Sequence, residues 1–579
     1  MILGLFFVMV SKLFAIVPAI VIRHIINYVA EAYTSYKTLT GTERIEYFDG
    51  FINQITLLGL LILGMAILSG VFLYFQRQTL IGASRLIEFD LKNEIYTHYQ
   101  TLPLSFYRKN NTGDLMARIS EDVSNVRMYL GPAIMYGLDL VMIFLITVPI
   151  MVSVNLKLTL LVLIPLPFLA LSIYFIENII NRRSSQIQKE LSNLSTYVQE
   201  SFSGLRVIKS FVREKDISEG FHTGSNVYRE KSLRLAKVNA FFFPLILSLI
   251  GLSVIIVIYV GGREVIAGNI EPGHIAEFII YINRLTWPVA ALGWTTSLVQ
   301  KAEASQARIN EFLNTKNDIV SEKNLDKEIS GNIEFKDVTL TYPDTGIIAV
   351  KNLSFTIREG QSVGIIGPTG SGKSTIANLL VRLYDPTGGS IFVGGNDLKD
   401  FNLFKYRNQV GYVPQDVFLF SDSIRNNIGF GALDIKEEDM LQAAKDADLY
   451  KNIIDFPEKF DTILGERGIT LSGGQKQRLS IARALARSPK LLILDDCLSA
   501  VDTNTEHTIL NNLKRIMAGR TTVVISHRVS SVKLADQILV LEQGEIAEQG
   551  SHEELMKRNG IYKSLYDKQL EEEKQELNN

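Results

Sequence analysis

The chain has a single cysteine, Cys497, among its 579 residues. One thiol cannot form a disulfide within a chain, so a disulfide-stapled secreted fold and a cysteine-based metal site are both excluded. An excess of charge of one sign is also missing, because 59 Lys and Arg residues balance 61 Asp and Glu residues and leave a formal net charge of -2. Without an overall basic field, we expect no nucleic acid among the partners.

Hydrophobic residues, in contrast, make up 47% of the sequence, and they gather in long runs in its first half. Six of these runs are near the roughly 20 residues that a helix needs to cross a bilayer core. The first begins directly after Met1 and is too long for the apolar region of a cleaved signal, so we interpret it as a retained transmembrane helix. The six predicted spans are residues 2–27, 51–75, 131–153, 156–179, 241–260 and 274–298.

The connections between the spans alternate in length and charge. Residues 76–130 and 180–240 form long links rich in Lys and Arg, whereas residues 154–155 and 261–273 form short ones. Because basic links stay preferentially on the cytoplasmic side, we expect a multi-pass protein of the cell (inner) membrane with its second half in the cytoplasm.

The two long links carry apolar residues at helical spacing with few helix breakers. We therefore expect the second to fifth spans to continue as helices far into the cytoplasm. Each pair of helices would be joined at its tip by a short turn, within residues 105–119 and 200–211. Gly113 and Gly204 are the predicted turn points.

Several side chains inside the predicted spans are charged or aromatic and are unusual for a lipid-facing helix. Lys12 and Asp139 are charged residues in the first and third spans, and such residues either face a cavity or pair with each other. Trp287, Trp294 and Phe241–Phe243 either line an apolar pocket or serve as packing and interface anchors. The sequence leaves both questions open.

The second half of the chain has a different pattern. Residues 316–330 are polar and charged and are interpreted as a linker. From Gly331 onward, short strands alternate with helices, which is typical of an α/β domain. Residues 567–579 are highly charged and are expected to form a solvated helical tail.

A glycine-rich motif, GPTGSGKS at residues 367–374, follows an apolar strand and opens a helix. Such a loop turns backbone N–H groups and a helix N-terminus toward phosphate oxygens. Lys373 would reach the β- and γ-phosphates of a nucleotide, and Ser374 would ligate Mg²⁺. The predicted nucleotide-binding residues of this loop are Gly367, Pro368, Thr369, Gly370, Ser371, Gly372, Lys373, Ser374 and Thr375.

Two further motifs accompany the phosphate loop. The apolar strand LLILDD, residues 491–496, ends in acid, and Asp495 at its end is a predicted Mg²⁺ ligand. LSGGQ, residues 471–475, places Ser472, Gly473, Gly474 and Gln475 ahead of a helix as a second anion cradle. One domain does not need two γ-phosphate cradles, so the second is expected to serve a partner's nucleotide.

With these motifs in this order, the chain resembles an ATP-binding cassette (ABC) exporter half-transporter of the type IV fold over nearly its whole length. The resemblance implies a multi-domain membrane protein. Its parts would be an all-α six-helix transmembrane domain with long cytoplasmic extensions (1–315), the linker (316–330), an α/β P-loop NTPase domain (331–566) and the tail (567–579). It also implies ATP-driven efflux of hydrophobic or amphipathic compounds across the lipid bilayer, driven by ATP-induced dimerisation of the cassettes.

The resemblance assigns further roles within the second domain. Gln415 matches the glutamine that touches Mg²⁺ and the attacking water, whereas Gln409, its rival, lacks the sequence context. The other matches are Tyr342 to the aromatic that stacks on adenine, Glu466 to the loop that meets the partner's tip, Asp502 to the loop that crosses the dimer interface, and His527 to the histidine that contacts the γ-phosphate.

One position departs from the family pattern. Most members have glutamate directly after the magnesium-binding aspartate, and this chain has Asp496. A side chain one methylene shorter holds its carboxylate farther from the water that it polarises, so we expect slow hydrolysis at this site. This favours a heterodimer with a second half-transporter over a homodimer, although the intact His527 and LSGGQ keep the homodimer open.

The cargo has two readings that the sequence does not separate: drug-like compounds, or a lipid such as lipid A. A soluble cassette protein acting on nucleic acid is disfavoured by the six spans and the absent basic field.

Overall fold

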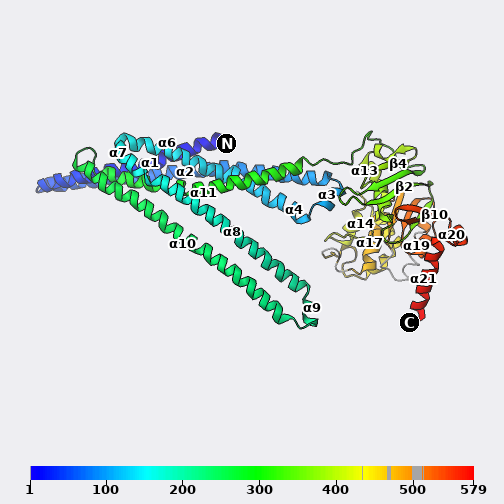
Figure 1. Ribbon diagram of the computed structural model, residues 1–579. Coiled ribbons are helices and arrows are strands. Elements are labelled where there is room, and N and C mark those ends of the chain that lie inside the picture. Colours follow the sequence, from blue (N-terminus) through cyan, green and yellow to red (C-terminus); the bar gives the residue numbers. More distant parts are fainter. Residues whose placement is uncertain are drawn as a thin grey trace. The chain divides into compact units, whose positions relative to one another are not determined.

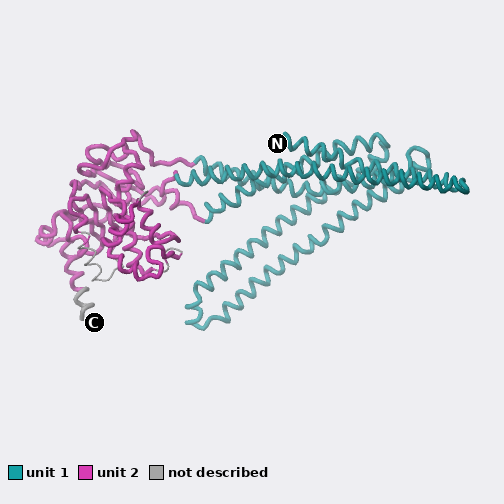
Figure 2. The backbone as a smooth tube through the Cα atoms, turned by 180° about the vertical axis from the view of Figure 1, so that it is seen from behind, with its two compact units in different colours: residues 1–100, 113–314 teal, residues 101–112, 315–579 magenta. Residues whose placement is uncertain are grey.

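The computed structural model describes residues 2–432, 435–465, 468, 471–497, 512 and 514–578, with side chains as far as Glu571. The chain forms two compact units (Figure 2). The first comprises Met1–Gln100 and Gly113–Asn314, and the second comprises Thr101–Thr112 and Thr315–Asn579. The short segment 101–112, predicted as part of the membrane domain, thus groups with the second unit.

The first unit is helical (Figure 1), and six of its described helical segments are long and apolar enough to cross a membrane. The six-span prediction is therefore confirmed. The main helices are α1 (Ile2–Thr38), α2 (Thr42–Thr101), α6 (Ile134–Val154), α7 (Leu156–Leu163), α8 (Pro165–Ser203), α10 (Glu214–Ile266) and α11 (Gly273–Leu313). Short helices α4 (Thr112–Ala117), η1 (Arg118–Asp122), α5 (Val123–Met128) and η2 (Tyr129–Ala133) lead into α6.

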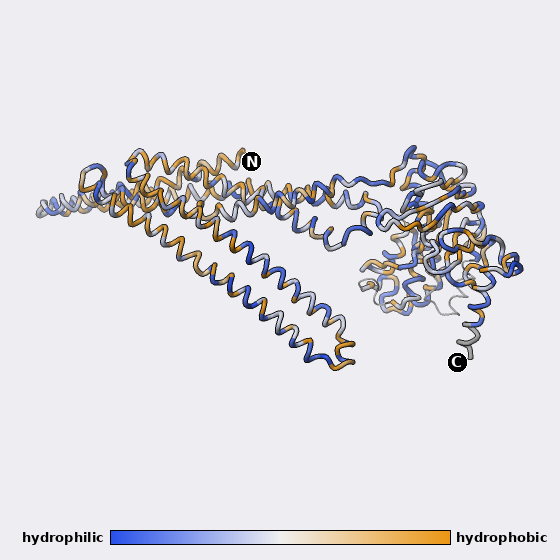
Figure 3. Tube along the Cα trace, viewed as in Figure 1, coloured by the Kyte–Doolittle hydropathy of each residue, from blue (hydrophilic) through white to orange (hydrophobic). Residues whose placement is uncertain are grey.

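Helices α8 and α10 lie side by side and form a long hairpin (Figures 1 and 2). Their apolar residues dominate at the end away from the tip, and polar residues increase toward it (Figure 3). The predicted continuation of the spans into polar surroundings is confirmed for this pair. Gly204 ends α8 as predicted, and α9 (Leu205–Ser210) forms the tip.

The first tip differs from the prediction in its turn point. Helix α3 (Leu104–Lys109) ends at Asn110, and α4 already begins at Thr112, so Gly113 lies inside a helix. Asn110 adopts an extended backbone, and its side-chain amide donates to the carbonyl of Phe106. The same carbonyl accepts the backbone N–H of Asn110 at 3.1 Å, so the asparagine closes the last turn of α3 with both its backbone and its side chain.

Charged residues within the spans pair with one another. Lys12 Nζ lies 3.1 Å from Asp139 Oδ1, and the amide of Gln76 donates to the same oxygen at 3.0 Å. The fully buried Glu277 binds Arg23 at 3.2 Å and accepts the hydroxyl of Tyr281 at 2.6 Å. Burying a charge without a partner is costly, so these pairs stabilise the bundle. Of the two readings for Lys12 and Asp139, the structure supports pairing.

The second unit contains two sheets. The antiparallel sheet has the order β2-β1-β4-β5, and the larger sheet has the order β10-β9-β3-β8-β7-β6. The strands are β1 (Ile333–Thr341), β2 (Ile348–Ile357), β3 (Ser362–Ile366), β4 (Gly388–Val393), β5 (Asn396–Asp397), β6 (Val410–Val413), β7 (Leu491–Asp495), β8 (Thr521–Ile525), β9 (Gln537–Glu542) and β10 (Glu545–Gly550).

In the larger sheet β6, β7, β8, β3 and β9 run parallel, and every residue of β3, β7 and β8 is buried. This agrees with their continuous apolar sequences, because a parallel strand covered on both faces needs no polar side. Described helices of this unit are α12 (Lys373–Leu380), α13 (Leu403–Asn408), α14 (Ile424–Gly429), α15 (Glu437–Asp446), α16 (Tyr450–Ile454), α17 (Gly473–Leu485), α19 (Val529–Val532), α20 (His552–Arg558) and α21 (Ile561–Asn578), with short 3₁₀ turns at Leu398–Asp400 and Lys459–Asp461.

The segment predicted as a linker is attached to the second unit along much of its length. Leu325 forms a parallel bridge with Phe401, and Lys323 forms an ion pair with Asp400 at 2.7 Å. Ile329 is buried in the core behind β1. Most polar residues of the segment 316–330 are exposed, and a few apolar residues attach it to the domain. Composition alone does not reveal this division.

Candidate nucleotide site

The phosphate loop connects β3 with α12. Gly372, the last residue before the helix, has φ 95°, and a Cβ there would lie 2.4 Å from the carbonyl oxygen of Ala349. Only glycine fits such a left-handed position with backbone so close. The Lys373 ammonium donates to the carbonyls of Gly367 and Pro368, each at 2.8 Å, which holds its charge over the loop.

The end of β7 meets this loop. The hydroxyl of Ser374 donates to Asp495 Oδ1 at 3.0 Å, so the two predicted Mg²⁺ ligands are together. Asp495 is 2% exposed, and burial raises its pKa to about 6. The Ser371 hydroxyl is buried without a hydrogen-bond partner among the described residues. Carboxylate and hydroxyl oxygens such as those of Asp495 and Ser374 are ligands that Mg²⁺ prefers. The Ser371 hydroxyl can donate to a phosphate oxygen, so the residues also fit a nucleotide phosphate.

Asp496 lies between two other predicted catalytic residues. Its Oδ1 is 2.8 Å from His527 Nδ1, and its Oδ2 is 3.5 Å from the amide nitrogen of Gln415. Strands β7 and β8 are adjacent and parallel, with Asp495 opposite Ile525, so the residues that follow them reach the same sheet edge. Asp496 has φ 48°, a left-handed conformation that Asp and Asn adopt more readily than other side chains.

Tyr342, the predicted adenine-stacking residue, lies beside the start of α12. Its hydroxyl is 3.0 Å from the hydroxyl of Thr375, and its ring meets Tyr384 edge-on at 5.1 Å between centroids. Arg108 of α3 lies over the same ring, with its guanidinium carbon 5.1 Å from the centroid. This cation–π contact was not predicted, because no motif relates residues so distant in sequence.

The LSGGQ motif begins α17. The Ser472 hydroxyl accepts the backbone N–H of Gln475 at 3.3 Å, and the Gln475 side chain accepts the N–H of Ser472 at 3.0 Å. This reciprocal capping box fixes the helix start, with Gly473 and Gly474 as its first residues. Two other predicted residues, Glu466 and Asp502, lie outside the part of the chain that the structure describes.

Gln569 is a contact of the site that the sequence did not reveal. From α21, its amide donates to the carbonyl of His527 and accepts from the N–H of Val529, both at 2.7 Å. One side chain thereby holds the backbone on both sides of Arg528. Gln569 stands in the segment interpreted as a solvated tail, and no motif marks it.

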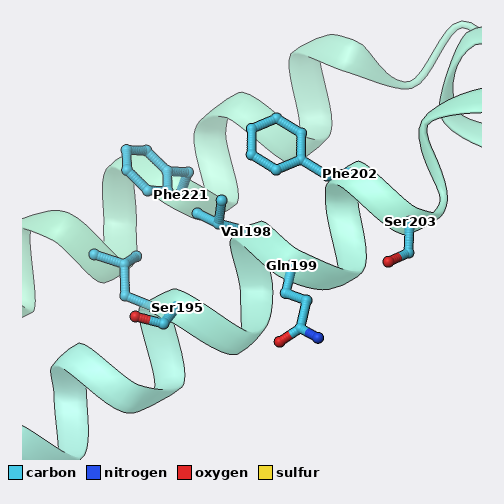
Figure 4. A pocket seen from close by; sticks show the side chains of 7 residues that line it. Ser195, Val198, Gln199, Phe202, Ser203 and Phe221 are labelled. Carbon is cyan, nitrogen blue, oxygen red and sulfur yellow. The ribbon is translucent and has the colours of Figure 1, made fainter. Parts of the chain in front are cut away.

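The tip of the α8–α10 hairpin carries an apolar groove of about 480 Å³ (Figure 4). Val198 and Phe202 of α8 and Phe221 of α10 lie along it. Phe202 and Phe211 are each 73% exposed, which is unusual for large apolar side chains outside a membrane. The tip is therefore a candidate contact surface.

Comparison with known proteins agrees with this architecture. Family models described as "ABC transporter transmembrane region" and "ABC transporter" match residues 1–289 and 350–499. A probable multidrug resistance ABC transporter ATP-binding/permease protein of Bacillus subtilis is 37% identical over 86% of this chain and 85% of its own length. An ATP-dependent lipid A-core flippase of Syntrophus aciditrophicus is 33% identical over 91% of this chain and 88% of its own.

The fold has a counterpart among solved structures. A bacterial Atm1-family ABC exporter with ATP bound matches with a TM-score of 0.76 and 24% identity, over 98% of this chain and 97% of the other. One polypeptide thus contains six spans and a phosphate loop that meets an acidic strand end. Its relatives match it over most of their length. The chain belongs to the ABC transporter family, as an exporter half-transporter that couples ATP hydrolysis to transport across the membrane.

Proposed function

We propose that the chain exports hydrophobic or amphipathic compounds, in the manner of a multidrug transporter. Two relatives support this cargo by their names, a probable multidrug resistance ABC transporter ATP-binding/permease protein of Bacillus subtilis and a multidrug resistance-like ATP-binding protein of Escherichia coli. The observation that carries ATP-driven export is the assembly of Ser374, Asp495, Asp496 and His527 at one sheet edge, in a chain with six membrane spans.

Within this site the residues have separate tasks. Lys373 neutralises the β- and γ-phosphates of ATP, and Tyr342 stacks on its adenine. Ser374, Asp495 and Gln415 would hold Mg²⁺, and the ion would neutralise charge on the phosphates. Asp496 orients the attacking water, and His527 contacts the γ-phosphate while it holds the Asp496 carboxylate.

Two copies of the cassette are needed for a complete site. We infer that Ser472, Gly473, Gly474 and Gln475 of one chain close over the ATP held by the other chain's phosphate loop. The exposed apolar groove at the α8–α10 tip supports docking of that tip on the partner's cassette. Asp496 favours a heterodimer, in which a second half-transporter supplies glutamate at its own site.

The experiment that tests the dimer and the Asp496 role is ATPase measurement on the purified chain in lipid, alone and as Asp496→Glu. If a heterodimer is needed, the chain alone turns over slowly, and the substitution raises turnover by about tenfold or more. Robust activity of the unaltered chain alone would contradict an obligate heterodimer. Unchanged turnover after Asp496→Glu would show that Asp496 does not limit the reaction.

The cargo is tested separately, by stimulation of that ATPase and by transport into inside-out vesicles. Drug-like amphipathic compounds should stimulate turnover and accumulate in the vesicles when ATP is present. Stimulation by phospholipid or lipid A alone, with no response to such compounds, would contradict multidrug export.

A further inference from the structure

A cavity of about 700 Å³ lies within the membrane unit, among α6, α8, α10 and α11. Its size is within the range of pockets that hold drug-sized ligands. Its walls are largely aromatic and aliphatic, and they include Tyr136, Phe242, Phe243, Trp287 and Trp294. For the aromatic residues whose role the sequence left undecided, Phe242, Phe243, Trp287 and Trp294 line this cavity, and Phe241 does not. Trp287 remains 70% exposed and Phe243 65%, so neighbouring helices of this chain do not cover them.

Glu177 of α8 is the one charged side chain among the described residues that line this cavity. No described residue forms an ion pair or hydrogen bond with its carboxylate. The other acidic groups discussed in the spans behave differently, because Asp139 pairs with Lys12 and Glu277 pairs with Arg23. A partly buried carboxylate without a cation is a costly feature of a membrane protein, and such residues mark the pathway of a substrate or ion.

Helix α11 is shaped to accept this carboxylate. A Cβ at Gly293 would lie 2.2 Å from Glu177 Oε2, so any larger residue there would displace the carboxylate. The next residue, Trp294, lines the same cavity, and Trp287 lies two turns earlier on α11. Tryptophan faces attract cations through the ring quadrupole, most strongly where water is excluded. A carboxylate and two indoles around one apolar space form a site for an organic cation.

We propose that this cavity binds the transported molecule and that Glu177 selects cationic aromatic compounds over neutral ones of the same shape. The inference rests on the proposed export of amphipathic compounds and narrows that class by charge. Arg284 on α11 does not line the cavity and has no ion pair with a described residue. An internal Glu177–Arg284 pair in another conformation is the rival role for the carboxylate.

The chain offers a direct readout of binding, because Trp287 and Trp294 are its only tryptophans and both line the cavity. Tryptophan fluorescence of the purified full-length protein in lipid nanodiscs can be titrated with two probes. Tetraphenylphosphonium is a permanent organic cation, and triphenylphosphine oxide is a neutral aromatic compound of similar size. ATPase stimulation by each probe gives a second, independent measurement.

Glu177→Gln should raise the Kd for tetraphenylphosphonium by about tenfold, since it removes the charge and keeps the shape. The Kd for triphenylphosphine oxide should change less than twofold, and Glu177→Asp should keep the preference for the cation. Glu200→Gln, at an exposed position on the same helix outside the cavity, is the matched control and should behave as the unaltered protein. Basal ATPase and thermal unfolding of each variant report whether it is folded.

Equal Kd values of Glu177→Gln and the unaltered chain for the cation would overturn the assignment. An equal loss for both probes, reversed by Arg284→Gln in the same chain, would show that Glu177 serves an internal ion pair instead. If neither probe binds or stimulates the unaltered protein but other amphipathic compounds do, the charge preference fails while export stands. If no such compound has any effect, the proposed function itself fails.

Discussion

At the residue scale, the nucleotide site depends on how Asp496 is held. Its two carboxylate oxygens face different neighbours, His527 at 2.8 Å and Gln415 at 3.5 Å. The short contact with the histidine fixes the carboxylate more firmly than the long one with the glutamine. Because an aspartate reaches less far than a glutamate, correct orientation by His527 matters more in this chain than in one with glutamate at the position.

His527→Ala should therefore lower kcat for ATP by about 100-fold, within the range of a lost positioned acid–base contact. The KM for ATP should change little, because Lys373 and the phosphate loop remain. His274→Ala, in the first turn of α11, removes a histidine outside the nucleotide site and should leave both constants unchanged. A rise in KM with unaffected kcat would assign His527 to binding alone.

The site residues that could be predicted are those whose roles are local in sequence. Gly372, Lys373 and Ser374 follow one strand within a few positions, so the motif itself contains their geometry. Arg108 and Gln569 could not be predicted, because each reaches the site from a segment distant in sequence. Such contacts depend on the tertiary packing of elements, which neither spacing nor composition encodes.

At the scale of elements, α21 acts on the loop after β8 through Gln569. The amide is bonded at 2.7 Å to backbone groups on either side of Arg528. Gln569→Ala should lower kcat several-fold, since the loop that aims His527 loses two hydrogen bonds worth about 1 kcal/mol each. The KM for ATP should stay within twofold.

Two measurements separate this positioning role from a loss of folding. Gln442→Ala removes a side-chain hydrogen bond on the exposed face of α15 and is the matched control, with kcat expected unchanged. The melting temperature of both variants should agree within a few degrees. If kcat of Gln569→Ala falls only in proportion to a lower folded fraction, the role is structural.

A second element-level contact joins η1 to α11. Asp122, which is buried, accepts the Ser305 hydroxyl at 2.8 Å and the Arg308 guanidinium at 3.0 Å. Arg308→Ala leaves the buried Asp122 carboxylate without its cationic partner, so the free energy of unfolding of the membrane unit should fall. Because Arg308 is half exposed, we expect the lower part of the range of about 1–3 kcal/mol. Thermal unfolding in detergent should show a lower midpoint. Arg234→Ala breaks the exposed pair with Glu230 and should have no measurable effect, so equal shifts would contradict the argument.

At the scale of the whole molecule, the sequence predicted both parts of the polypeptide because each has a strong periodic or local signal. Apolar runs marked the six spans, and alternating strands and helices marked the cassette. Nothing in the sequence indicates that residues 101–112 group with the second unit, because contacts such as that of Arg108 with Tyr342 depend on tertiary packing. The pairing of Lys12 with Asp139 was also undecided, because it depends on the rotation of two helices about their axes.

The chain holds one phosphate loop and one LSGGQ motif, and the proposed dimer requires that they serve different ATP molecules. Lys373→Ala removes the phosphate-binding charge, and Gly474→Asp adds a carboxylate to the anion cradle, so each variant alone should be inactive. When the two are mixed and reconstituted together, half of the dimers contain both chains. In those dimers, the intact phosphate loop of one chain faces the intact LSGGQ motif of the other. At the second site both the phosphate loop and the LSGGQ motif are altered.

Mixing should thus restore roughly a quarter of the activity of the unaltered homodimer, if its two sites act independently and the chains exchange freely. ATPase measured after co-reconstitution tests this, and crosslinking of differently tagged chains confirms that mixed dimers form. Mixed dimers without activity would mean either that each chain completes its own site or that one intact site cannot act without the other. If the unaltered chain is inactive by itself, the same pair of variants is introduced one into each half of the heterodimer. Activity should then survive when Lys373→Ala is in this chain, because the partner's phosphate loop still faces this chain's LSGGQ, and it should stay low in the reverse arrangement, where the intact loop is the one beside Asp496.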